Sequence, residues 1–76
     1  RVAGTGTVEP DGRVGPIGGV QQKVFTAEAA GADVMLVPRE NYEEALAAAT
    51  QIQLVPVSTV EEALTWLASA ASSREA

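Results

Sequence analysis

The 76-residue sequence contains neither cysteine nor histidine. Without cysteine the chain can form no disulfide framework and no thiolate metal site. Without histidine it also lacks the commonest zinc ligand and the commonest catalytic base. We therefore expect no metal site among these residues.

Basic charge is also scarce, because five Lys and Arg residues stand against ten Asp and Glu and the formal net charge is −5. The four arginines are scattered along the chain rather than clustered. Proteins that bind nucleic acid through its phosphates need a basic patch, so we expect no nucleic-acid partner. No apolar run reaches the roughly 20 residues that a membrane-spanning helix requires.

Large aromatic side chains are limited to one Trp, one Tyr and one Phe, although 46% of the residues are hydrophobic. A chain of this length and composition builds one small core, close to the lower size limit for independent stability. It begins at Arg1 without a methionine, and its first residues already have the pattern of a strand. We therefore expect a piece of a longer protein.

The N-terminal third has the pattern of a β-hairpin. Two extended runs, 2–8 and 13–15, are joined by Pro10-Asp11-Gly12, which combines a fixed φ, a turn-forming carboxylate and a residue that accepts positive φ. Gly4 and Gly6 alternate with small residues in the first run. This predicts that another part of the structure approaches that strand closely.

Helical periodicity begins after a glycine pair, Gly18-Gly19. Val20, Val24 and Ala27 form one stripe of a helix, and Gly31 is placed to end it. The apolar run "DVMLVP" predicts a buried strand, and a capping box of Asn41 and Glu44 is predicted to start a second helix.

The C-terminal third repeats this order. The run "IQLVPV" predicts a strand, whose Pro56 suits an edge position. Ser58 and Glu61 form a second capping box before a helix with the stripe Val60, Leu64 and Leu67. The order of hairpin, helix, strand, helix, strand and helix predicts an α/β fold of the two-layer α+β kind, with the domain at 1–71 and a frayed tail at 72–76.

Lys23 is the only lysine in the chain and falls in the first turns of the predicted helix. A lysine acts as a base only when neutral, which burial beside Val20, Val24 and Ala27 would favour. The ordinary alternative is a solvated residue on an amphipathic helix. Gly18-Gly19 either forms a tight turn or presents backbone amides to an anion, but Lys23 does not directly follow a glycine as in a Walker A loop.

Thr5 and Thr7 of the first strand are either ordinary β residues or hydroxyl groups that line a site. Glu43-Glu44 and Glu61-Glu62 fall in first helical turns, where carboxylates complement the helix dipole. We assign these acidic pairs a structural role.

Taken together, these motifs carry a resemblance. The stretch "AGTGTVEPDGRVGPIGGVQQKVFTAEAAGADVMLVP", followed by "NYEEA" and "LVPVSTVEEAL", resembles the C-terminal half of the proteolytic domain of Lon-type serine proteases. It is most similar to bacterial Lon-like proteases that carry a PDZ domain before this one, which also have a long "EPDG"-type turn. The resemblance covers nearly the whole chain and is most specific from Gly12 to Lys23.

The resemblance implies a site and a reaction. In this family a Ser–Lys dyad hydrolyses peptide bonds through an acyl-enzyme, and Lys23 matches the lysine base. The family serine lies upstream, and none of the serines at 58, 69, 72 and 73 matches it. Ala3 stands where many Lon proteases have a threonine beside the lysine, a part that Thr5 or Thr7 could take.

The resemblance also implies the surroundings of the domain. We expect protein or peptide substrates, no cofactor, contact with the upstream half of the same protease domain, and assembly into a homo-oligomer. The PDZ-bearing relatives lack an ATPase and are membrane-anchored with the protease outside the cytoplasm, whereas a true Lon is cytoplasmic. By itself the chain is expected to be inactive, because it carries the base without the nucleophile.

Two other classes stay open. The first is a non-catalytic Lon-fold module for assembly or interaction, which usually lacks the lysine. The second is a stand-alone α/β binding domain, which a glycine-rich first strand does not favour.

Overall fold

The structure is a computed structural model that describes the backbone of residues 1–75 and the side chains of residues 1–70. Its elements, in chain order, are β1 (Val2–Gly4), β2 (Thr7–Val8), β3 (Val14–Gly15), α1 (Val20–Ala29), β4 (Val34–Pro38), the 3-10 helix η1 (Arg39–Asn41), α2 (Tyr42–Leu46), β5 (Gln53–Val57) and α3 (Val60–Glu75). The predicted α/β order is confirmed.

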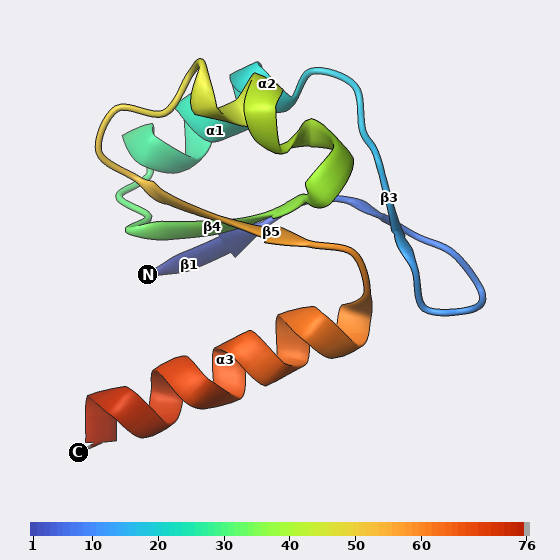
Figure 1. The fold of residues 1–76 in the computed structure, drawn as a ribbon. Coiled ribbons are helices and arrows are strands. Elements are labelled where there is room, and N and C mark those ends of the chain that lie inside the picture. The colour runs from blue at the N-terminus through green and yellow to red at the C-terminus, as the bar shows by residue number, and fades with distance from the viewer. Residues whose placement is uncertain (76) are drawn as a thin grey trace.

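A parallel three-stranded sheet of order β1-β4-β5 forms the centre of the fold, with α1 and α2 on one face and α3 on the other (Figure 1). The apolar run of β4 is explained by this position, since β4 has a neighbouring strand on each side and a helical layer on each face. The core lies between the sheet and the pair α1 and α2, and it comprises Val20, Val24, Ala27, Met35, Val37, Ala45, Ile52 and Leu54. Pro56 lies on β5, an edge strand, as predicted.

The hairpin consists of β2 and β3, closed by the predicted turn. The backbone N–H of Gly12, at φ 89°, donates to the Glu9 carbonyl at 2.9 Å, and the N–H of Glu9 donates to the Arg13 carbonyl at 2.8 Å. The expectation of one continuous strand over 2–8 was wrong, because the chain bends at Gly6 (φ 153°) and β1 pairs with β4 instead.

The hairpin is joined to the rest of the fold through the start of α3. Val14 N–H donates to the Ser58 carbonyl at 2.8 Å, and Val60 N–H donates to the Gly12 carbonyl at 2.9 Å. The close approach predicted for the glycine-rich strand comes from the chain itself, since a Cβ at Gly6 would lie 2.8 Å from Val14 Cγ1.

The ends of α1 are set by two glycines with positive φ. Gly19 (φ 66°) precedes the helix, and Gly31 (φ 88°) follows it in a Schellman motif, with Gly31 N–H donating to Glu28 O and Ala32 N–H to Ala27 O. Gly31 therefore ends α1 as predicted.

Both predicted capping boxes were wrong in detail. Asn41 makes no capping hydrogen bond to α2. At α3 the box is shifted by one residue, to Thr59 and Glu62: the Glu62 N–H donates to Thr59 Oγ1 at 3.0 Å, and the Thr59 N–H donates to Glu62 Oε1 at 3.2 Å.

The packing of α3 differs from the predicted stripe. Leu64 is 61% exposed and Leu67 is 36% exposed, whereas Trp66 is half-buried over β5. The helix continues to Glu75, through most of the segment for which a frayed tail is predicted, and Ala76 lies outside the described residues.

Candidate functional site

Lys23 lies one turn into α1, where its backbone N–H donates to the Gly19 carbonyl at 3.2 Å. Its side chain is exposed, while Val20, Val24 and Ala27 of the same helix face the core. Within this chain, Val20, Val24 and Ala27 therefore do not bury the Lys23 side chain. Within the described part of the chain, the Lys23 ammonium has no hydrogen-bond or ion-pair partner.

The two flanks of α1 differ. On one flank, Gln21 Nε2 donates to the Glu44 carbonyl of α2 at 3.3 Å, and Glu28 accepts hydrogen bonds from the loop before β5. Lys23 lies two positions after Gln21, and Thr26 lies two positions before Glu28. Two positions correspond to about 200° around a helix, so Lys23 and Thr26 lie on the flank turned away from α2. A group that reacts with Lys23 must approach along that open flank.

Glu28 fixes the flank of α1 that carries Gln21 by accepting four hydrogen bonds. Its carboxylate accepts from the backbone N–H of Thr50 at 2.7 Å and the Thr50 hydroxyl at 2.8 Å, and from the N–H groups of Gln51 and Ile52 at 3.2 Å each. These bonds, led by that from the Thr50 backbone, lower the pKa of Glu28 from 4.5 to about 2. The C-terminal half of α1 is thus tied to the α2–β5 loop.

The segment before α1 is held by a buried side chain. Ile17 N–H donates to Asn41 Oδ1 at 2.9 Å, and Asn41 Nδ2 donates to the Ile17 carbonyl at 3.0 Å. Gly18 and Gly19 then face open space, because no heavy atom beyond the adjacent residues lies within 4 Å of a Cβ built at either position. The predicted support residues Gly18 and Gly19 therefore form an exposed turn that leads directly to α1.

Alternation along one continuous strand would place Thr5 and Thr7 on the same face, but the bend at Gly6 separates them. Thr5 N–H donates to the Leu36 carbonyl at 3.1 Å, and Thr5 lines an apolar groove of about 290 Å³ beside α3. Thr7 lies opposite Gly15 in the hairpin, with its Oγ1 2.7 Å from the site of a Gly15 Cβ. Neither threonine makes a hydrogen bond to the Lys23 side chain in the described structure.

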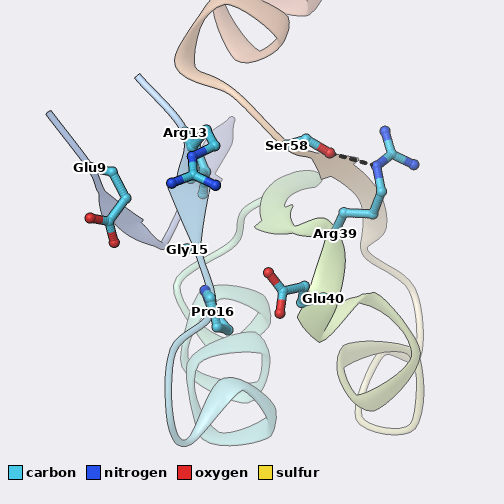
Figure 2. Close-up of a pocket in the computed structure, with 8 residues that line it drawn as sticks. Glu9, Arg13, Gly15, Pro16, Arg39, Glu40 and Ser58 are labelled. Atoms are coloured by element: carbon cyan, nitrogen blue, oxygen red, sulfur yellow. Dashed lines mark hydrogen bonds between the residues drawn. The ribbon is translucent and has the colours of Figure 1, made fainter. Parts of the chain in front are cut away.

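A second cavity, of about 370 Å³, lies between the hairpin and the segment after β4 (Figure 2). Its wall carries both signs of charge, from Glu9, Arg13, Arg39 and Glu40. The Ser58 hydroxyl in this wall accepts a hydrogen bond from Arg39 Nε at 2.8 Å. The Ser58 hydroxyl therefore faces a guanidinium.

Among the described residues, no three or more acidic side chains lie together in a way that could hold a metal ion. The same part of the chain contains no helix long and apolar enough to cross a membrane.

Comparison with known proteins decides the family. The sequence model of the Lon protease C-terminal proteolytic domain matches residues 1–69. The chain belongs to this family. Similar proteins include the Lon proteases of Campylobacter concisus and Campylobacter jejuni, each 44% identical over 45 residues, a match that covers 59% of this chain and 6% of the relative. The matched part is therefore a small fraction of those proteins.

Sequence reasoning found the Lon-type segment around Lys23 but missed Asn41, to which it gave a capping role. Asn41 and Ile17 are 24 residues apart, and no periodic pattern connects them. The only local signal was a polar residue at the end of η1, the short helix that follows the buried strand β4.

Proposed function

We propose that this chain carries the lysine base of a Lon-type serine endopeptidase, with Lys23 as that base. The serine nucleophile is supplied by the upstream half of the same protease domain. The observation that carries the proposal is the state of Lys23: it is the sole lysine, it projects from a firmly anchored helix, and it has no partner within the described chain. A lysine left without a counter-ion on an open flank is suited to pairing with a group from outside.

In the proposed reaction, neutral Lys23 takes the proton of the serine hydroxyl as its oxygen attacks the peptide carbonyl. The proton passes to the leaving amine, and an acyl-enzyme remains. Water then attacks the ester with Lys23 again acting as base, which releases the carboxylic acid and restores the serine. Burial of Lys23, which this chain does not provide, would come from the upstream half packing over the open flank of α1.

The support roles proposed for the remaining site residues follow from their positions. Gly18-Gly19 sets the turn that leads into α1, and its backbone amides are the candidates for contact with a developing oxyanion. Thr5 or Thr7 replaces the threonine that many Lon proteases have at the position of Ala3. Thr5 is the better placed for contact with a partner surface, since it lines the open groove beside α3.

The proposal can be tested on the parent polypeptide, which is the longer protein that contains this chain together with the proposed upstream half. The test is labelling with a fluorophosphonate probe, which modifies an activated serine. We expect labelling of the parent, loss of labelling in Lys23→Ala, and no labelling of the 76-residue chain alone. Gln22→Ala is the matched control, because Gln22 is the exposed neighbour of Lys23 on α1 and makes no side-chain hydrogen bond in the described structure.

Labelling that is indifferent to Lys23→Ala, or a parent without a reactive serine, would contradict the proposal. That outcome would favour the alternative of a non-catalytic Lon-fold module for assembly or interaction. Thermal unfolding of each variant shows whether a loss of labelling reflects chemistry or loss of fold.

The resemblance to PDZ-bearing relatives extends the proposal to the parent protein. It would be membrane-anchored, act outside the cytoplasm on protein or peptide substrates without ATP, and form a homo-oligomer. Fractionation of cells with an antibody to this domain tests the location, and a parent recovered in the cytoplasmic fraction would indicate a true Lon instead.

A further inference from the structure

Asn41 is the one buried polar residue among those described, with 6% of its surface exposed. Transfer of an amide out of water is unfavourable unless its hydrogen bonds are replaced. In Asn41 both kinds of hydrogen bond are replaced, because the acceptor Oδ1 and the donor Nδ2 each have a partner. A buried amide kept in this way holds a defined partner in a defined orientation.

That partner is a single residue, Ile17. Asn41 accepts from the Ile17 N–H at 2.9 Å and donates to the Ile17 carbonyl at 3.0 Å, as a neighbouring β-strand would. The Ile17 side chain also packs against the core. Both the backbone and the side chain of Ile17 are therefore fixed.

The position of Ile17 gives this clamp its importance. Two glycines separate it from α1, and glycine loses more conformational freedom on folding than any other residue. On the side where a Cβ would stand, no atom beyond the adjacent residues lies within 4 Å of Gly18 or Gly19. The turn is held at its two ends, by Asn41 acting on Ile17 and by the fully buried Val20.

The position of Lys23 depends on the second end of this turn, because the Lys23 N–H donates to the Gly19 carbonyl in the first turn of α1. We infer that Asn41 is a positioning residue for Lys23: it fixes the start of α1 and thereby the place from which the lysine reaches its partner. The catalytic part of this inference rests on the proposed function. Misplacement of a catalytic group by about 1 Å can reduce a rate about 100-fold.

Two variants of Asn41 test the inference. Asn41→Ala removes both hydrogen bonds, and Asn41→Asp has nearly the same shape but, when ionised, cannot donate to the Ile17 carbonyl. In the parent polypeptide we expect kcat for a peptide substrate to fall about 10- to 100-fold in Asn41→Ala, with KM unchanged. In the 76-residue chain, amide hydrogen exchange at residues 18–23 should become faster in both variants.

Glu28→Gln is the matched control. Glu28 also ties α1 to a distant segment, but at the C-terminal half of the helix. We expect this variant to lower thermal stability while leaving kcat and the exchange of residues 18–23 unchanged.

The readouts separate two ways of failing. If Asn41→Ala lowers kcat only in proportion to its folded fraction, or leaves exchange at 18–23 unchanged, Asn41 is a purely structural residue and the inference is wrong. If the parent shows no Lys23-dependent activity, the proposed function is wrong, and faster exchange at 18–23 would still support the role of Asn41 in fixing the start of α1.

Discussion

At the scale of single residues, some glycines of this chain stand where neighbouring atoms leave no room for a Cβ, and others stand in open space. A Cβ at Gly6 would lie 2.8 Å from Val14 Cγ1 and 3.3 Å from Pro38 Cγ, at a φ of 153°. Gly18 has an ordinary φ and no heavy atom within 4 Å of a Cβ. The bend that separates β1 from the hairpin thus depends on glycine at position 6.

This contrast predicts different effects of alanine. Gly6→Ala should destabilise the chain by about 1–3 kcal/mol, because the backbone conformation is unfavourable for alanine and the new methyl group meets Val14. Gly18→Ala should change stability by less than about 0.5 kcal/mol. Urea unfolding of the two variants measures both values, and equal effects would show that the bend at Gly6 does not have the described geometry.

At the scale of elements, the start of α3 shows how tertiary contacts shift a boundary that local sequence almost locates. Ser58 and Thr59 both suit an N-cap, with Glu61 or Glu62 three residues on. Ser58 belongs to the sheet side of the junction, since its carbonyl accepts from Val14 N–H and its hydroxyl accepts from Arg39. Thr59 therefore caps the helix.

Replacement of the two hydroxyls should reflect this division. Thr59→Ala should lower the free energy of unfolding by about 1 kcal/mol, the usual value of an N-cap. Ser58→Ala should have a smaller effect, because the hydrogen bond that it loses, from Arg39, is exposed to solvent. Denaturant titrations followed by circular dichroism compare the two variants. A larger effect of Ser58→Ala would show that Ser58, and not Thr59, caps α3.

The sequence predicted those features that depend on local pattern. The buried stripe of Val20, Val24 and Ala27, the two parallel strands and the glycine that ends α1 are all set within a few residues. The errors concern long-range partners: β1 pairs with a strand about thirty residues later, and Asn41 turns from the start of its own helix to Ile17. The sequence pointed to Lys23 because the residues of its motif are contiguous, whereas Asn41 lies 24 residues from Ile17.

At the scale of the whole molecule, carboxylates connect segments that are far apart or form turns. Glu28 joins α1 to the α2–β5 loop, Glu62 accepts from the N–H of Ser58 at the start of α3, and Asp11 accepts from the N–H of Arg13 in the hairpin turn. In each case the first cause of the lowered pKa is a backbone hydrogen bond to the ionised group. The fold therefore favours the charged form of all three.

This arrangement predicts acid sensitivity of a definite sign. A carboxyl whose pKa is lower in the folded state stabilises the fold above its unfolded pKa, and that stabilisation disappears as the pH falls through the folded value. For Glu28 the loss lies between its ordinary pKa of 4.5 and about 2. The urea midpoint should thus be nearly constant from pH 7 to about 5 and fall below that.

Glu28→Gln should lower the midpoint at neutral pH and make it less dependent on pH below 4.5, because the amide cannot ionise and retains one acceptor for the N–H groups of Thr50, Gln51 and Ile52. Glu43→Gln is the control, since Glu43 is exposed and accepts no hydrogen bond in the described structure. Urea midpoints measured from pH 7 to pH 2 for the three proteins decide the point. The dependence of the urea midpoint on pH could instead be the same in Glu28→Gln as in the unsubstituted chain. In that case the acid response arises elsewhere, and the tie between α1 and the α2–β5 loop is not made by an ionised Glu28.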